Sequence, residues 1–240
     1  MTVQLFAVSF GASRPAELAR FWSEVLGREM ADDTTLVPPD DPGFRIRFRP
    51  LPEPKTGPNR MHFDLTSRSP EQQQETVAKA LSLGAKHIDV GQTPDDRHVV
   101  LADPEGNEFC VIEAGNNFLA GTGFIGALSC DGSQRVGYFW SEALGWPLVW
   151  DQDEETAIQS PRGGSKISWG GPPFAVRTGR DRVHYDLAPP ADGDQQAEAD
   201  RLVALGATLV DDAEGDGDDG TLVLADPDGA EFCLLTPRRA

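Results

Sequence analysis

Two short segments of the chain each carry a histidine and an aspartate two residues apart. RMHFDL contains His62 and Asp64, and RVHYDL contains His184 and Asp186. Alternate side chains of a strand share a face, so each pair is expected on one side of its strand. A histidine near a carboxylate can act as a general base or hold a ligand by hydrogen bonds. The alternative is a locally paired polar residue, so both histidines are candidate catalytic residues.

A second repeated segment adds a glutamate and a cysteine in each half. EFCVIE places Glu108 and Cys110 on one strand face, and EFCLL does the same for Glu231 and Cys233. A cysteine activated by a nearby histidine is a nucleophile, whereas a buried one packs as a small apolar side chain. These four residues are therefore candidate ligand-binding residues. Cys130 has no counterpart in the first half.

Three arginines alternate along one predicted strand of the first half. FRIRFR directs Arg45, Arg47 and Arg49 to one face. Their guanidinium groups could hold a carboxylate or phosphate of a ligand. In a chain of net charge −18 they could equally pair with Asp64 and Glu108 of the same half.

The second half differs at the corresponding positions. It has Lys166 and Ser168 there, so the two candidate sites are not equivalent. Trp146 and Trp150 follow a predicted helix, and either could stack on a ligand.

The motifs recur in the same order along the chain. ARFWSEVLG is matched by GYFWSEALG, RMHFDL by RVHYDL, and LADPEGNEFC by LADPDGAEFC. Trp22 and Trp140 are 118 residues apart, and Asp103 and Asp226 are 123 apart, so the spacing is nearly constant. Such order indicates an internal duplication. We divide the chain into domains at 1–118 and 119–240.

Strand and helix patterns alternate within each half. In the first half, a strand at 6–10 precedes a helix capped by Ser13 and ended by Gly27, and extended segments follow up to 44–50. A strand at 62–66, a helix at 71–83 and a hairpin at 98–113 complete the half. The pattern predicts an α+β fold with four βαβββ modules. They would form two cup-shaped sheets with helices outside and polar residues in the cups.

These residues resemble the vicinal oxygen chelate superfamily, which includes glyoxalase I, extradiol dioxygenases and bleomycin-resistance proteins. The resemblance rests on ARFWSEVLG, KTGPNRMHFDL and LADPEGNEF. Enzymes of the family bind a divalent metal through four ligands from the first, fourth, fifth and last strands. The resemblance places these positions at Ala7 and Ile125, Arg47 and Ser168, His62 and His184, and Cys110 and Cys233.

The resemblance therefore implies two cups that keep one histidine each but lack an intact metal site. No cofactor is expected, although Glu108 or Glu231 could complete a His/Cys/Glu set for a divalent metal. We predict a small-molecule-binding protein of the glyoxalase and bleomycin-resistance type. The alternative is a lyase, isomerase or dioxygenase of the family that uses His62 or His184, with or without a metal.

Composition restricts the partners. With 21 basic and 39 acidic residues, the chain is expected to bind neither nucleic acid nor an anionic membrane surface. It contains no apolar run of about 20 residues and no signal-peptide pattern, and its three cysteines suit a reducing, cytoplasmic location. The expected partner is a small-molecule ligand, which a monomer or a homodimer could bind.

Overall fold

The computed structural model of the chain describes residues 3–39, 42–93, 95–174, 181–210 and 220–238. Each half contains two βαβββ modules, as predicted. The first half consists of β1 (Gln4–Ala12), α1 (Pro15–Leu26), β2 (Met30–Asp32), β3 (Thr35–Leu36), β4 (Arg45–Pro50), β5 (Met61–Leu65), α2 (Pro70–Ser82), β6 (Lys86–His87), β7 (Val99–Ala102) and β8 (Glu108–Val111).

The second half repeats this order. It consists of β9 (Ile125–Cys130), α3 (Gln134–Leu144), β10 (Leu148–Gln152), β11 (Glu155–Gln159), β12 (Lys166–Trp169), β13 (Val183–Ala188), α4 (Gln195–Leu205), β14 (Thr208–Leu209), β15 (Leu222–Ala225) and β16 (Glu231–Leu234). None of the helices in the described part of the chain has the length and hydropathy to cross a membrane.

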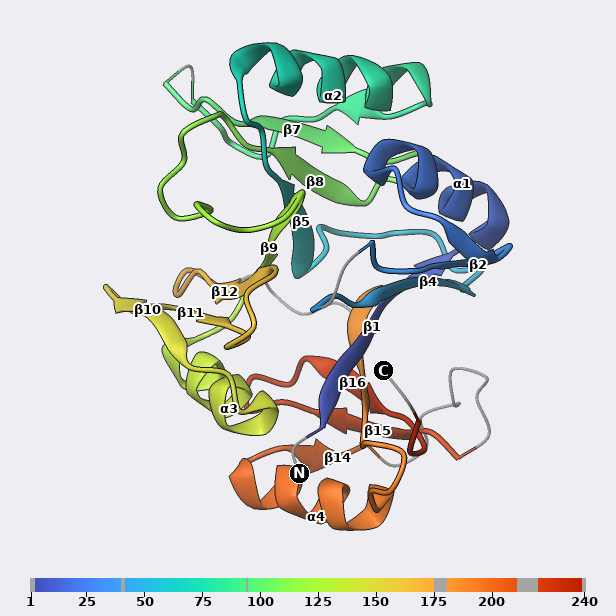
Figure 1. Cartoon of the computed structure of the whole chain (residues 1–240), viewed down its shortest axis with the longest axis vertical. Coiled ribbons are helices and arrows are strands. Elements are labelled where there is room, and N and C mark those ends of the chain that lie inside the picture. The colour runs from blue at the N-terminus through green and yellow to red at the C-terminus, as the bar shows by residue number, and fades with distance from the viewer. Residues whose placement is uncertain (1–2, 40–41, 94, 175–180, 211–219, 239–240) are drawn as a thin grey trace.

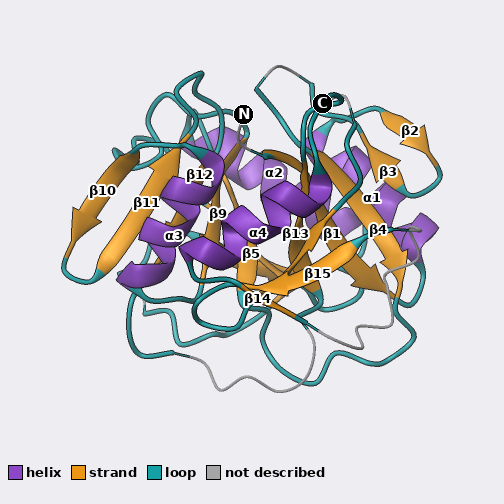
Figure 2. Ribbon diagram, turned by 90° about the horizontal axis from the view of Figure 1, so that it is seen from below, coloured by secondary structure: helices purple, strands orange, loops and turns teal. Residues whose placement is uncertain are grey.

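The modules pair across the two halves to form two mixed sheets of eight strands. The first sheet has the order β14-β15-β16-β13-β1-β4-β3-β2, and the second has the order β10-β11-β12-β9-β5-β8-β7-β6. β1 pairs antiparallel with β13, and β5 pairs antiparallel with β9 (Figure 1). The outer strands β2 and β10 lie at opposite sides of the molecule (Figure 2). Each sheet therefore combines the first module of one half with the second module of the other.

This pairing corrects one expectation from the sequence. The arginines of β4 do not lie with Asp64 and Glu108 of their own half. Arg47 instead forms an ion pair with Asp186 of β13, with 3.0 Å between Nη1 and Oδ2. The reason is topological, because β4 and β13 both flank β1 in the first sheet.

One large core joins the helices and the inner faces of both sheets. Phe10 of the first sheet meets Phe63 of the second with 5.3 Å between ring centroids, and Trp22 of α1 packs edge-on against Phe63 at 5.4 Å. A smaller apolar cluster lies on the other face of each sheet. It surrounds Cys233 in the first sheet and Cys110 in the second. The alternation predicted for the strands is therefore confirmed, with apolar side chains on the core face.

The repeated motifs contact one another within each half. Trp22 Nε1 donates to Asp103 at 3.0 Å, and Trp140 Nε1 donates to Asp226 at 3.2 Å. The predicted cap of the first helix is wrong: α1 begins at Pro15, and no side chain caps it from within the segment. Instead the Glu105 carboxylate accepts the backbone N–H groups of Ser13 and Arg14. The turn between β7 and β8 thus fixes the start of α1.

Candidate functional site

The two sheets carry the same set of polar residues on the face that is turned away from the core. We call the face bearing His184, Asp186 and Cys233 the first cup, and the face bearing His62, Asp64 and Cys110 the second cup. In each set one donor atom per residue lies within 4.8 Å of the other two. His62 and Cys110, which come from different strands, therefore lie on the same face of the sheet.

A serine from the neighbouring strand holds each aspartate in place. Ser9 of β1 donates to Asp186 at 2.7 Å, and Ser129 of β9 donates to Asp64 at 2.5 Å. Both serines were missed in the sequence, although each lies between apolar residues on a strand pattern that already predicts its face.

The sheet register also corrects a position carried over from the family. In the first sheet, Ala7 lies opposite Arg45 of β4. Lys166 of β12 is the counterpart of Arg45 in the second sheet, and it lies opposite Ala127. The counterpart of Ala7 is therefore Ala127 and not Ile125. Ile125 is buried in the main core. The number of residues between the first strand and the following helix differs between the two halves. Counting a fixed number of residues back from the helix therefore identifies the wrong residue in the second half.

The pKa of His62 in the second cup is raised above its ordinary value. His62 Nε2 lies 3.4 Å from Asp64 Oδ1. Burial lowers the pKa of His62, but hydrogen bonds to Asp64 and Cys110, and the charges of these groups, more than offset it and raise the pKa to about 10. An imidazolium donates a proton or hydrogen bond and does not accept one. This favours a ligand-holding or acid role over that of a general base.

A cavity of about 530 Å³ opens above His62. Drug-sized ligands occupy cavities of roughly 300–1,000 Å³. Phe118 and Trp150 line it together with Ser129 and Ser168, whose hydroxyl groups are 3.3 Å apart. The remaining lining residues include Arg60, Asp131 and Glu155.

The first cup is nearly closed. Asp186 is 1% exposed and binds both Ser9 and Arg47, while His184 Nε2 lies 3.5 Å from Asp186 Oδ1. Burial raises the pKa of Asp186, but His184, Ser9 and Arg47 outweigh it and hold the pKa below its ordinary value. The cavity beside His184 measures about 50 Å³, enough for a few water molecules.

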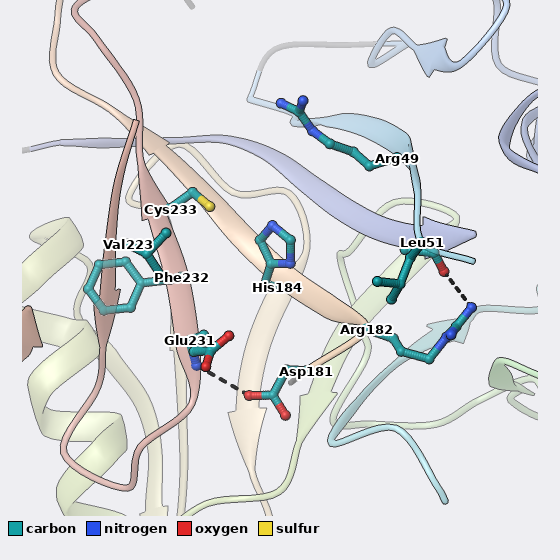
Figure 3. A pocket seen from close by; sticks show the side chains of 10 residues that line it. Arg49, Leu51, Asp181, Arg182, His184, Val223, Glu231, Phe232 and Cys233 are labelled. Atoms are coloured by element: carbon teal, nitrogen blue, oxygen red, sulfur yellow. Dashed lines mark hydrogen bonds between the residues drawn. The ribbon is translucent and has the colours of Figure 1, made fainter. Parts of the chain in front are cut away.

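Figure 3 shows the residues that line this small cavity. The side chain of Arg182 extends below His184, and its Nη2 donates to the carbonyl of Gly11 at 2.9 Å. Asp181 accepts the backbone N–H of Glu231 at 3.2 Å at the other side of the cavity. Arg49 and Cys233 complete the wall. These side chains border the small cavity beside His184.

Two sequence differences explain why one cup is open. The register places Arg47 beside Ser9 and places Ser168 beside Ser129. Two residues further along the strand, Arg49 corresponds to Gly170. The first cup therefore contains the guanidinium groups of Arg47 and Arg49. At the equivalent positions the second cup has only the hydroxyl group of Ser168 and the hydrogen atom of Gly170.

Several candidate residues have structural partners. Glu108 pairs with Lys55 at 2.5 Å and accepts the N–H of Asn59, so it is not part of the donor set around His62. Lys166 donates to the carbonyl of Phe118 and lies 4.6 Å from the centre of that ring.

The remaining candidates are divided between the two cups and other parts of the molecule. Arg45 stacks on Phe6 in the first sheet, 4.6 Å from the ring centre. Glu231 lines the small first-cup cavity. Trp146 lies outside both cups and lines a separate cavity, whereas Trp150 is 38% exposed and touches Phe118 edge-on.

The donor atoms of the second cup fit a divalent metal in type and number. His62, Asp64 and Cys110 offer nitrogen, oxygen and sulfur, and catalytic zinc takes three such protein ligands and one open position. Asp64 takes the place that the sequence had assigned to Glu108. The first cup fits less well, because Arg47 places a fixed positive charge on the Asp186 carboxylate.

Comparison with known proteins agrees with this fold. A family model for the glyoxalase-like domain matches residues 7–112 and again 126–235. The chain therefore belongs to the glyoxalase-like domain family of the vicinal oxygen chelate superfamily, which confirms the resemblance seen in the sequence. No curated protein matches the chain.

Solved structures extend this likeness over the full length. Glyoxalase I from Zea mays is 13% identical with a TM-score of 0.65, over 98% of this chain and 92% of that one. A single-residue variant of the same enzyme gives a TM-score of 0.66 at 13% identity, over 98% and 92%. A glyoxalase-related enzyme from Fulvimarina pelagi matches 52% of this chain and 96% of its own, with 15% identity and a TM-score of 0.40. At these identities the maize structures show a shared fold only.

Proposed function

We propose that the protein binds a small aromatic compound in the second cup. The observation that carries this proposal is the difference in volume between the two cups, about 530 Å³ over His62 against about 50 Å³ beside His184. An open cavity with exposed aromatic rings is costly to keep in water unless a ligand covers it. The first cup then serves a structural role.

The lining indicates how such a compound would be held. The rings of Phe118 and Trp150 offer faces and edges for stacking. His62 offers a charged donor at the base of the cavity, and the hydroxyl groups of Ser129 and Ser168 can donate or accept. An aromatic compound with an oxygen acceptor matches these groups.

The test is a thermal-shift screen of the full chain with matched aromatic amines, neutral aromatics and aromatic carboxylates. A ligand of the native state raises the melting temperature. Any hit is then repeated with Ser168→Arg, which reproduces the side chain of the first cup and is expected to abolish the shift. Arg49→Gln, in the first cup, is the matched control and should retain it. Neutral or amine hits that survive Ser168→Arg would overturn the proposal.

A second candidate function is metal-assisted catalysis in the same cup, favoured by the donor set of His62, Asp64 and Cys110. A divalent metal would supply a Lewis acid that polarises an oxygen of the bound compound. Binding would displace the proton of His62 and deprotonate Cys110, so affinity would rise with pH.

Metal analysis after dialysis against zinc tests this second function. One equivalent of zinc that is lost in both Cys110→Ser and Asp64→Asn, but retained in Cys233→Ser, would support it. Retention of zinc in Cys110→Ser, or no bound zinc, would exclude this metal centre.

A further inference from the structure

A large cavity lies at the junction of the two sheets, apart from both cups. It measures about 710 Å³ and shares no lining residue with the cavities over His62 and His184. The starts of β1 and β9 and the ends of α1 and α3 form its walls, together with the loops around Phe44 and Gly164.

The cavity is built from equivalent parts of the two halves that carry different side chains. α1 and α3 both end at a glycine in the left-handed conformation, Gly27 with φ of 64° and Gly145 with φ of 66°. The residue that follows is Arg28 in one half and Trp146 in the other, and both line the cavity. One half thus contributes a cation where the other contributes an aromatic ring.

Arg28 has an unusual environment for a guanidinium group. Its Nη1 donates to the carbonyl of Phe44 at 3.0 Å, and the group lies 5.3 Å from the centre of that ring. Burial lowers the pKa of Arg28 to about 10. No acidic side chain in the described part of the chain pairs with it. A partly buried cation of this kind is stabilised by an anion.

The cavity is lined by both polar and apolar groups. The charged residues among the described lining residues are Arg28 and Arg162, in a chain of net charge −18. Ser160 and Ser165 add hydroxyl groups, and apolar surface comes from residues such as Leu5 and Trp146. Arg28 therefore lines a cavity that also offers hydroxyl groups and apolar surface.

We propose that this junction cavity binds a small organic anion. The guanidinium of Arg28 holds the acidic group by charge-assisted hydrogen bonds, and Phe44 and Trp146 contact the apolar part of the ligand. Both carboxylates and phosphate monoesters fit this chemistry. The site is independent of ligand binding in the second cup.

The test is a nuclear magnetic resonance titration of the full chain with benzoate, phenyl phosphate and, as a neutral control, phenol. The indole N–H signals of the five tryptophans are assigned with single Trp→Phe variants. At least one of the two anions should shift the Trp146 signal, and it should do so equally in the Ser168→Arg variant, in which the second cup is filled. Phenol should bind at least tenfold more weakly, and Arg28→Gln should weaken the anion at least tenfold.

Comparison of benzoate with phenyl phosphate identifies which acidic group the site prefers. If Arg28→Gln does not fold, nuclear Overhauser contacts in the unaltered protein between the ligand ring and Phe44 and Trp146 decide the matter. The proposal is overturned if neither anion shifts Trp146, if phenol binds equally well, if a folded Arg28→Gln protein keeps its affinity, or if those contacts are missing.

Discussion

The ion pair between Arg47 and Asp186 provides a direct test of the way the modules pair. Replacing Arg47 by Gln leaves a carboxylate that is 1% exposed without its cation. Breaking a buried pair typically costs about 3–5 kcal/mol. Because Asp186 keeps Ser9 and His184 as neighbours, we expect a loss of about 2–4 kcal/mol in the free energy of unfolding.

A double-mutant cycle makes this prediction specific. Urea unfolding of Arg47→Gln, Asp186→Asn and the double variant should give a coupling energy of about 1–3 kcal/mol. The cycle of Arg47→Gln with Asp64→Asn should be additive within about 0.5 kcal/mol, because Asp64 belongs to the other sheet. Ser168→Ala, at the position equivalent to Arg47, should cost about 1 kcal/mol or less. Coupling to Asp64 in place of Asp186 would refute the described topology.

Three further predictions concern titration and reactivity. His62 should titrate near pH 10 when it is followed by nuclear magnetic resonance. Asp64→Asn should lower the pKa of His62 by about 1–3 pH units, whereas Asp186→Asn should leave it unchanged. A pKa near 6.5 for His62 in the unaltered protein would contradict this. Burial raises the pKa of Asp103 to about 6. The protonated carboxyl group of Asp103 therefore stabilises the folded protein by about 3 kcal/mol below about pH 4, and this stabilisation is lost as the pH rises through 6. The stability advantage of the protein over Asp103→Asn should therefore shrink between pH 4 and 7 in urea unfolding, and a constant difference would disprove it. Because burial raises the pKa of Cys130 to about 12, iodoacetamide should leave Cys130 unmodified in the native protein, as peptide mass analysis would show; rapid modification would contradict this.

The repeated motifs predicted the modules because their residues have local roles. The FW segment and the DP turn recur together since Trp22 binds Asp103 and Trp140 binds Asp226. Strand alternation placed His62, Asp64 and Cys110 on one face, since side-chain direction follows from sequence position alone.

The pairing of modules was not predictable in the same way. β1 could pair with β5 or with β13, since both segments carry His-x-Asp between apolar residues. The sequence therefore led to Arg47 beside Asp64, whereas tertiary packing places it beside Asp186. Cavity volume also depends on this pairing, because it decides which histidine Arg47 and Arg49 lie near.

Crystals soaked with the aromatic compounds that raise the melting temperature would show whether a ligand binds above His62. We expect ligand density between Phe118 and Trp150, with an oxygen within hydrogen-bonding distance of His62. Density for those compounds beside His184, or at no position in the second cup, would contradict it.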